Sequence, residues 1–495
     1  MSRVAFISLL FVLVLPQVFF SSCDPDQEFQ TGSDISLEFS VDTLQFDTVF
    51  TARGSATRSF KVYNRSDQPI MIDRISVDGM TGVNYTFNID GSQGPEVRDQ
   101  IVWAEDSIWV FVEVEVDPTA PTEVSPFIAE DLIRFETGER SATVVLQALG
   151  QNANYLLGID NQDPRVISCD NGTLQLDNSL PIVIYGQLFV DSCALEFIAG
   201  SRIYIHGGIT RNDAFGIFND GFIFALPQGS LRFLGTLDDP VIVQSDRLEE
   251  EFNEGPGQYR GIFLGPQSTG NVIRHTQLLH GIEGLSVDSL AEVEIENSII
   301  AYTAGSALIG RNATVTARNS LFHSNFGNTI QFIQGVRLDM DHCTVASYGV
   351  DASSIALQNF QCFDPECNQA AVVPVRLNVR NSILAGSRSD EIIFNDGFNR
   401  TDPTLFRVDI SNSVVRVSNN FTSENSDWTD FFDNLCSGCY NLQPGDPLFE
   451  SVEMDDYRLD SLSVALDLGE LIPGLEQDIE GNERATPVAA GAYFE

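Results

Sequence analysis

The chain has 495 residues, and 27 lysines and arginines against 70 aspartates and glutamates give it a net charge of −43. So acidic a protein repels nucleic acid and anionic lipid head groups, which argues against both as partners. Hydrophobic residues make up 43% of the chain. The chain can therefore bury a large core and is not a disordered tail.

The first 22 residues have the features of a bacterial signal peptide. Arg3 precedes an apolar stretch over residues 4–20, and two serines then lead to Cys23. The sequence Phe-Ser-Ser-Cys resembles a lipobox, whose cysteine becomes the lipidated first residue of the mature protein. The acidic residues that follow resemble the surface-export signal of Bacteroidota lipoproteins. We expect residues 23–34 to form a lipidated tether and the protein to lie on the outer membrane, exposed at the cell surface and held by its lipid alone. An ordinary signal peptide followed by a chance cysteine is the alternative.

Residues 35–153 alternate apolar and polar residues in short runs, with turn signals between them. One run places a valine or isoleucine at every second position from Ile108 to Val116, and Asp78-Gly79 is a turn signal. About seven such strands predict a β-sandwich of immunoglobulin-like shape. The segment 59–70 resembles the start of the Ig-like modules that precede repeat domains in exported proteins.

Residues 154–445 contain a six-residue motif that repeats. Its copies begin at Asn271, Val293, Val315, Leu338, Leu377 and Val408. Its fifth position is held by His275, Asn297, Asn319, His342, Asn381 and Asn412. The steps between fifth positions are 22, 22, 23, 39 and 31 residues, so the last two contain loop insertions. This period indicates a solenoid, and the alternation within the motif indicates strands.

We interpret each motif as a strand that turns a corner, with its fifth residue at the bend. In a parallel β-helix, equivalent side chains stack about 4.8 Å apart. Asparagine suits such a ladder because its amide both donates and accepts hydrogen bonds, and histidine can replace it. The chain here resembles the right-handed parallel β-helix repeat family over residues 155–495. The resemblance implies the fold and a structural role for the six fifth-position residues, with residues 446–495 as the segment that closes the helix.

Seven cysteines follow Cys23, and export favours disulfides. The candidates for disulfides are Cys169, Cys193, Cys362, Cys367, Cys436 and Cys439. The first two would pin the early coils, and the next two would close a small loop. The last two form a CxxC motif, which suits a structural disulfide, a zinc site shared with the middle pair, or a redox pair. Cys343 falls in a core-facing slot of the repeat, and we expect it to stay unpaired.

The strongest candidate for catalysis is the sequence Asp339-Met340-Asp341-His342. Pectate lyases with this fold hold calcium with carboxylates beside a base. However, His342 occupies a ladder slot. A lyase also needs a cluster of basic residues, and no coil supplies more than a scattered arginine. Adjacent acids such as Asp238-Asp239 and Asp455-Asp456 could serve glycoside hydrolysis, but both resemble turns. We therefore assign no catalytic residue.

Acidic loops such as residues 160–163 offer oxygen ligands but lack the spacing of known calcium motifs. We therefore predict no metal site and no cofactor, and we leave calcium binding open. Five segments read Asp, then Ser or Thr, then an apolar residue, and they resemble the O-glycosylation acceptor of exported Bacteroidota proteins. Their hydroxyl residues are Thr43, Thr48, Ser107, Ser289 and Ser461.

Together these features predict an all-β chain, with an Ig-like sandwich at 35–153, a right-handed parallel β-helix at 154–445 and the closing segment at 446–495. We expect a non-catalytic cell-surface lipoprotein that presents the β-helix to polysaccharide or to an envelope protein. One alternative is a β-helix polysaccharide lyase or glycoside hydrolase, which needs two or more acids beside an arginine in a groove. The other is a structural subunit of an outer-membrane complex, which would expose a large apolar patch, most plausibly on the sandwich.

Overall fold

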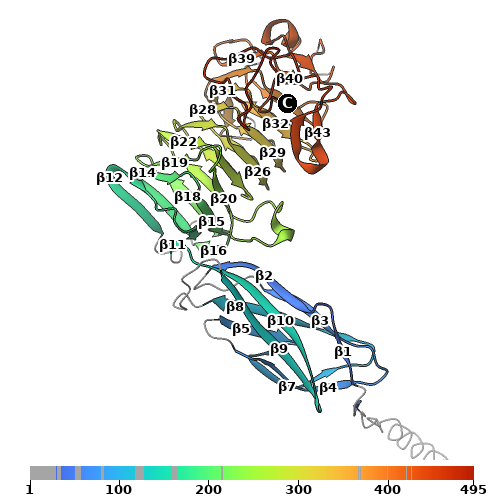
Figure 1. The fold of residues 1–495 in the computed structure, drawn as a ribbon. Coiled ribbons are helices and arrows are strands. Elements are labelled where there is room, and N and C mark those ends of the chain that lie inside the picture. Colours follow the sequence, from blue (N-terminus) through green and yellow to red (C-terminus); the bar gives the residue numbers. More distant parts are fainter. Residues whose placement is uncertain are drawn as a thin grey trace, which may run out of the picture. The chain divides into compact units, whose positions relative to one another are not determined.

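The computed structural model describes residues 29–30, 35–50, 57–79, 83–116, 127–158, 164–212, 216–365, 367, 369–398, 400–419, 421–424 and 426–494. The predicted signal peptide and Cys23 lie outside these residues, as does most of the predicted tether. The chain forms two compact units, Met1–Asn152 and Ala153–Glu495. Both are drawn in Figure 1. In the part of the chain that is described, no helix has the length and apolar character needed to span a membrane.

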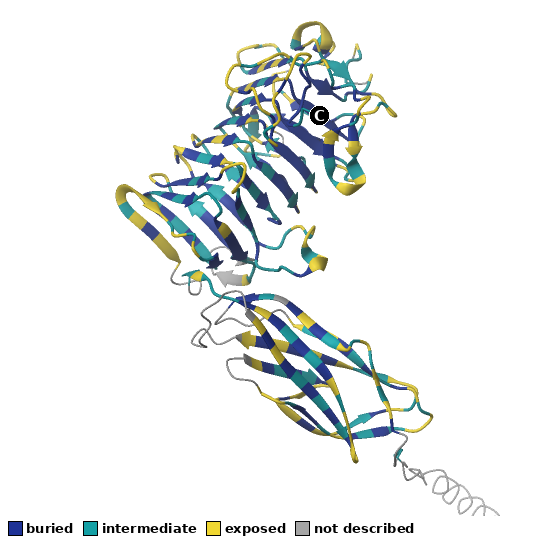
Figure 2. Cartoon of the chain, in the orientation of Figure 1, coloured by how far each residue is buried: buried dark blue, intermediate teal, exposed yellow. Residues whose placement is uncertain are grey.

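The first unit consists of two five-stranded sheets. One has the order β1 (Leu37–Phe39), β3 (Arg58–Asn64), β8 (Ser107–Val116), β5 (Val83–Ile89) and β6 (Ser92–Gln93). The other has the order β2 (Thr43–Phe50), β10 (Arg140–Gln151), β9 (Phe127–Thr137), β4 (Ile70–Val77) and β7 (Glu96–Val102). Neighbours are antiparallel except β2 and β10, which pair parallel. The alternating residues Val110, Val112 and Val114 are buried, which gives the banded strands of Figure 2.

This sandwich has ten strands, whereas the sequence pattern indicated about seven. The edge strands account for the difference. Strand β6 has only two residues, too few to show alternation. Strand β7 reads Glu-Val-Arg-Asp-Gln-Ile-Val, and its charged residues mask the period of two. Charged side chains suit an edge strand because they discourage pairing with another chain.

The second unit is a parallel β-helix with three faces (Figure 1). Face 1 is an 11-stranded sheet of β11 (Asn154–Leu157), β13 (Ile182–Tyr185), β15 (Arg202–His206), β20 (Val241–Ser245), β23 (Thr276–Leu279), β26 (Ile299–Thr303), β29 (Leu321–Asn325), β32 (Thr344–Ser347), β37 (Ile383–Gly386), β40 (Val414–Val415) and β42 (Tyr440–Asn441). Faces 2 and 3 are connected in one 17-stranded sheet, which begins with β12 (Arg165–Gln175) and β14 (Gln187–Ile198). Strand β14 belongs to both faces, since it pairs with β18 of face 3 and β19 of face 2.

Face 2 continues with β19 (Ser230–Leu234), β22 (Asn271–Arg274), β25 (Glu292–Glu296), β28 (Ala313–Arg318), β31 (Val336–Asp341), β36 (Val375–Arg380), β39 (Phe406–Ser411) and β41 (Cys436–Ser437). Face 3 continues with β18 (Phe222–Ala225), β21 (Gly261–Leu264), β24 (Leu285–Val287), β27 (Leu308–Gly310), β30 (Ile330–Phe332), β33 (Ile355–Gln358) and β38 (Ile392–Asn395). The six motif copies are the six strands of face 2 from β22 to β39, and their first residues are direct register partners. The predicted fold class is therefore confirmed.

Short ribbons and helices interrupt the coils. The ribbons are β16 (Ile209–Asn212) with β17 (Gly216–Asn219), β34 (Phe360–Cys362) with β35 (Ala370–Val372), and β43 (Phe449–Ser451) with β44 (Asp456–Leu459). The helical turns are η2 (Glu250–Phe252), η3 (Phe431–Leu435) and η4 (Val452–Met454). The hairpin β34–β35 accounts for the repeat step of 39 residues.

The corner between faces 2 and 1 depends on a left-handed backbone. The fifth motif residues His275, Asn297, Asn319, His342, Asn381 and Asn412 have φ values of 42°, 50°, 50°, 52°, 49° and 50°. Most side chains disfavour this conformation, whereas asparagine and histidine tolerate it. The structure thus places these residues at the bend and gives a backbone reason for their identity.

The sixth motif residue forms a second ladder at the same corner. Its members are Thr276, Ser298, Ser320, Cys343, Ser382 and Ser413. The Ser382 hydroxyl donates to the Arg380 carbonyl at 2.8 Å and accepts the Cys343 N–H at 3.0 Å. Cys343 takes a serine's place in the ladder, since its Sγ contacts the Asp341 carbonyl at 3.5 Å and accepts the Ser320 N–H. The thiol is unpaired and fully buried, which confirms the prediction for this cysteine.

The described part of the C-terminal segment, residues 446–494, packs along the outer side of face 1. Outward apolar residues of that face, among them Leu321, Ile383 and Val414, form one buried cluster with Leu459 and Ala490 of the segment. The core near the end of the coils is completed by a different stretch. There the Trp428 ring lies 5.0 Å from Phe394 and 5.3 Å from Phe406, measured between ring centroids.

The serine ladder makes a prediction for Cys343. Cys343→Ser restores the hydroxyl of the other coils, so we expect the free energy of unfolding to stay within about 1 kcal/mol of the wild type. Cys343→Val has a similar size but leaves the buried Ser320 N–H without an acceptor, which should cost about 1–3 kcal/mol. Urea unfolding of both variants measures the difference. Equal stability of the two variants would contradict the ladder.

Candidate functional site

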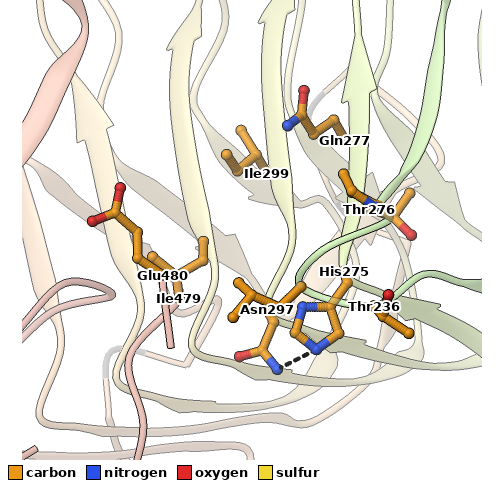
Figure 3. Close-up of a pocket in the computed structure, with 10 residues that line it drawn as sticks. Thr236, His275, Thr276, Gln277, Asn297, Ile299, Ile479 and Glu480 are labelled. Atoms are coloured by element: carbon orange, nitrogen blue, oxygen red, sulfur yellow. Dashed lines mark hydrogen bonds between the residues drawn. The ribbon is translucent and has the colours of Figure 1, made fainter. Parts of the chain in front are cut away.

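A pocket opens at the corner between faces 2 and 1, and we call it the corner pocket. Its volume is about 320 Å³. It is lined by Thr236, Leu237, Pro240, His275, Thr276, Gln277, Asn297, Ile299, Ile479 and Glu480. The turn between β19 and β20 forms one wall, two successive corners form the floor, and the C-terminal segment forms the opposite wall (Figure 3).

The two walls meet at Gly481. Its φ is +87°, and a Cβ atom there would lie 2.5 Å from Leu237 Cδ2. The left-handed backbone therefore favours glycine at this position, where the C-terminal segment contacts the turn. The pocket exists because the segment bends away at this point and leaves the corners at His275 and Asn297 partly exposed.

The imidazole of His275 is held by its neighbour in the ladder. Asn297 Nδ2 lies 3.2 Å from His275 Nε2, which accepts the hydrogen bond and leaves the proton on Nδ1 (Figure 3). Burial lowers the pKa of His275, so the ring is neutral at pH 7. The pocket thus offers a neutral imidazole, two amide side chains and the Thr236 hydroxyl beside apolar walls.

Glu480 is the one carboxylate among the ten lining residues. It forms an ion pair with Arg458, and Figure 3 shows its carboxylate pointing away from the His275 ring. This carboxylate is therefore already engaged by an arginine. The lining therefore provides hydrogen bonds and apolar contact, and it lacks the two facing acids that glycoside hydrolysis uses.

Beyond the pocket the ladder passes under the C-terminal segment. Asn319 Nδ2 donates to Asn297 Oδ1 at 2.9 Å, and Arg484 of the segment donates to Asn319 Oδ1 at 2.7 Å. Asn381 Nδ2 lies 2.9 Å from His342 Nε2 and 2.6 Å from the Glu470 carbonyl. Asn319, His342 and Asn381 are each at most 2% exposed, so the structure gives them a structural role.

Between Asn319 and His342, the side chain of Arg484 takes the place of a direct contact between neighbouring ladder residues. It is 5% exposed and also donates to the carbonyls of Gly491 and Ala492 at 3.0 Å. Burial lowers its pKa to about 10, so it remains charged at neutral pH. Sequence reasoning missed this residue because its ladder partner lies 165 positions away.

The Asp339-Met340-Asp341-His342 sequence is fully engaged in structural contacts. Asp339 forms an ion pair with Arg337 at 3.1 Å, and Asp341 forms one with Arg380 at 2.6 Å. Met340 lies in the core. Burial is the main cause that lowers the pKa of His342 to about 3, so its ring is neutral.

A second polar cluster, which we call the clasp, fastens the C-terminal segment to face 1. Asp455 accepts hydrogen bonds from Ser324 Oγ at 2.7 Å, Tyr302 Oη at 2.9 Å and Tyr457 Oη at 3.3 Å. His323 Nδ1 lies 3.7 Å from the same carboxylate. Burial alone would raise the pKa of Asp455, but the bonds from His323, Ser324 and Tyr302 outweigh it and hold the pKa well below its usual range. The sequence showed Asp455 only as part of a turn.

The six candidate cysteines form three disulfides. These are Cys169–Cys193, Cys362–Cys367 and Cys436–Cys439. The CxxC motif is therefore a disulfide in this structure, and within the described residues no group of three or more His, Cys, Asp or Glu side chains is arranged to hold a metal. The acidic loop at 160–163 lies outside the described residues.

The five candidate glycosylation sites differ in exposure. Ser461 is exposed, whereas Thr43, Thr48, Ser107 and Ser289 are half-buried. Asn312 Nδ2 also donates to the Ser289 hydroxyl at 2.7 Å. Ser461 is therefore the most accessible of the five, and its modification stays a prediction.

No protein-family model and no curated protein matches this chain. Among solved structures, the catalytic unit of a GH87 α-1,3-glucanase from Streptomyces thermodiastaticus is 12% identical, with a TM-score of 0.33 over 72% of this chain and 74% of that one. The complex of XylC with xylose is 8% identical, with a TM-score of 0.28 over 91% and 87%. The E. coli chaperone DraB is 13% identical, with a TM-score of 0.16 over 23% of this chain and 55% of that chaperone. Likenesses at these TM-scores carry no argument about activity or ligand.

The clasp makes a prediction about pH. Because the pKa of Asp455 is depressed in the folded chain, its stabilisation is present above the unfolded value of about 3.9 and is lost as pH falls through the folded value. Asp455→Asn should lower the free energy of unfolding by about 1–3 kcal/mol at pH 7, and the difference should shrink below pH 4. Urea unfolding across this range measures it. Asp456→Asn is the control, since that side chain makes a partly exposed ion pair with Arg458 and accepts the Arg458 backbone N–H on the same strand. A difference that is the same at pH 7 and pH 2.5 would contradict the prediction.

Proposed function

We propose that this protein is a non-catalytic cell-surface lipoprotein that binds polysaccharide on the outer side of its β-helix, at the corner pocket. The observation that carries the proposal is the composition of the pocket. Gln277, Asn297 and His275 present hydrogen-bonding groups next to the apolar side chains of Leu237 and Ile299.

This combination suits a sugar ring, which has hydroxyl groups at its edge and C–H groups on its faces. Amide side chains both donate and accept, as hydroxyl groups do, so they can bind a sugar hydroxyl in either direction. Apolar walls with a few fixed polar groups are the usual composition of a small-molecule site. The pocket opens to the outside of the solenoid, so one unit of a longer glycan could occupy it.

Binding without cleavage is favoured by the carboxylate content of the pocket. Retaining and inverting glycosidases of the common type use two carboxyl groups on either side of the scissile bond. The lining residues provide only Glu480, which already pairs with Arg458. A lyase would also need a base, and His275 donates from Nδ1 while its Nε2 is occupied by Asn297.

The place of the protein on the cell is proposed from its first residues. The signal-like segment, the lipobox ending in Cys23 and the acidic residues after it support a lipid anchor in the outer membrane and exposure at the surface. They also support a β-helix repeat lipoprotein of the Bacteroidota type. An anchored protein with a glycan site would hold polysaccharide close to the cell.

A second candidate function, a subunit of an outer-membrane assembly, is favoured by aromatic side chains on the sandwich. On β8, Trp109 is 47% exposed and Phe111 is 43% exposed, and their rings stack with centroids 6.1 Å apart. Lys61 lies 4.6 Å from the Trp109 ring. Exposed, clustered aromatic residues are common at protein interfaces. A glycan screen in which nothing binds would favour this candidate.

Retention on immobilised neutral polysaccharides tests the binding proposal. Gln277→Ala removes one hydrogen-bonding side chain from the pocket and should weaken binding about 3- to 10-fold. Gln244→Ala is the matched control, because Gln244 also points outward from face 1 but does not line the pocket. Release of reducing or unsaturated ends during the assay would show catalysis and overturn the non-catalytic part of the proposal.

Membrane fractionation tests the lipid anchor. Cys23→Ser removes the thiol that would carry the lipid, so we expect the protein to move from the membrane fraction to the soluble fraction and to lose labelling by a radioactive fatty acid. Cys343→Ser is the control for cysteine loss, because that thiol is buried in the β-helix core. Labelling that persists in Cys23→Ser would rule out Cys23 as the lipidated residue.

A further inference from the structure

Face 2 of the β-helix collects arginines that the sequence shows as scattered. Seven of the 27 basic residues of the chain point outward from it, namely Arg232, Arg274, Arg318, Arg337, Arg376, Arg380 and Arg407. Five of the face 2 strands from β19 to β39 supply one of them, β36 supplies two and β25 supplies none, so a count along any one coil finds no cluster. Stacking in register brings arginines of successive coils side by side, so residues that are scattered along the sequence lie near one another on this face.

Most of these arginines have structural partners. At the end of the face 2 strands, Arg274, Glu296, Arg318, Asp341 and Arg380 follow one another in register, with charges that alternate in sign. Arg274 pairs with Glu296 at 3.0 Å, and Arg380 pairs with Asp341 at 2.6 Å. A ladder of alternating charges neutralises itself and needs no ligand.

A different arrangement occurs at the start of the strands, in a set that we call the arginine row. Arg337, Arg376 and Arg407 are direct register partners on β31, β36 and β39. All three are exposed, and neighbouring strands of a sheet lie about 4.8 Å apart. Arg337 pairs with Asp339, whereas Arg376 and Arg407 have no ion pair or side-chain hydrogen bond with any of the described residues.

Three like charges in register are unfavourable in the free protein. The positions beside the row on the same strand face are Asp339, Asn378 and Asp409, which are also direct register partners. The middle arginine, Arg376, therefore has the neutral Asn378 beside it on its own strand. A row of anionic groups on a ligand would relieve the repulsion. Guanidinium groups suit carboxylate and sulfate because their donors match two oxygens at once.

Two inserted loops border the arginine row. The hairpin β34–β35, tied by the Cys362–Cys367 disulfide, leads directly into β36 and its Arg376. The base of the hairpin packs beside β31, since a Cβ atom at Gly335 would lie 2.4 Å from Val373. The next loop, before β39, carries Phe398, which is 41% exposed, and the hairpin turn carries Phe363, which is 65% exposed. Sugar rings can pack on such exposed aromatic rings.

We infer that the arginine row is a second glycan site, which binds the carboxylate or sulfate groups of an anionic polysaccharide along the helix axis. The inference rests on the proposed function in taking a glycan as the ligand, but it concerns a different face and different residues. The spacing of the row places one arginine on each coil, so successive charged groups of an extended chain can each meet one guanidinium. Arg376 and Arg407 make the contacts that the free protein leaves unused.

The test measures binding of the full chain to four probes: polygalacturonate, dextran sulfate, neutral dextran and polyglutamate. The double variant Arg376→Gln/Arg407→Gln should lose at least about tenfold in affinity for one or both anionic glycans, because each lost charged hydrogen bond contributes that order of effect. Arg274→Gln makes the same chemical change on the same face at an ion-paired arginine, and it should change affinity by no more than about twofold. All the substituted side chains are exposed, and thermal unfolding verifies that the variants fold.

Wild-type binding of an anionic glycan that the double variant loses, with neutral dextran unaffected, supports the inference. Anionic glycan binding that is equal in the double variant and the wild type overturns it, as does a wild-type protein that binds neither anionic glycan. Polyglutamate that binds as tightly as the glycans overturns the glycan assignment in favour of an acidic protein partner. Binding of neutral polysaccharide that depends on Gln277 reports separately on the corner pocket, so failure of the arginine row is distinguishable from failure of the proposed function.

Discussion

The left-handed residue at the corner between faces 2 and 1 is the constraint on which the rest of the β-helix depends. Six successive coils turn there with φ between 42° and 52°. Asparagine and histidine accept this backbone, and the serine that follows satisfies the N–H group of the preceding coil. Because every coil turns at the same place, the outward side chains of face 2 fall into straight rows. The arginine row and the floor of the corner pocket are both consequences of that alignment.

The sequence predicted the coils well because their signals are local and repeated. The alignment of the motif copies, from the one that begins at Asn271 to the one that begins at Val408, reproduces the strand register of face 2. The position of Cys343 in the motif also predicted that its side chain is buried. It did not predict the contacts of Arg484 or Asp455, since these join segments 165 and 131 positions apart and leave no periodic trace. The arginine row was missed for another reason. Each coil contributes one member, and the set is visible only when the coils are stacked.

The candidate binding site is the uncovered part of a structural ladder. The C-terminal segment supplies hydrogen-bond partners to Asn319 and Asn381, which leaves them almost fully buried. The segment stops covering the ladder at Gly481. The ladder residues there, His275 and Asn297, remain open to a ligand. A group that accepts a protein hydrogen bond in one coil can accept a sugar hydroxyl in another. The fold therefore needs no special loop to make this pocket.

The position of the C-terminal segment has a consequence for the order in which the chain acquires its structure. Coils can stack as each emerges, because they contact mainly their neighbours. The outward apolar residues of face 1, such as Leu321, Ile383 and Val414, are covered mainly by residues beyond 446. During synthesis these side chains stay in water until the last tenth of the chain arrives. A chain cut short at its end would retain most of its coils yet present an apolar stripe to its neighbours, which makes the final residues a protection against aggregation.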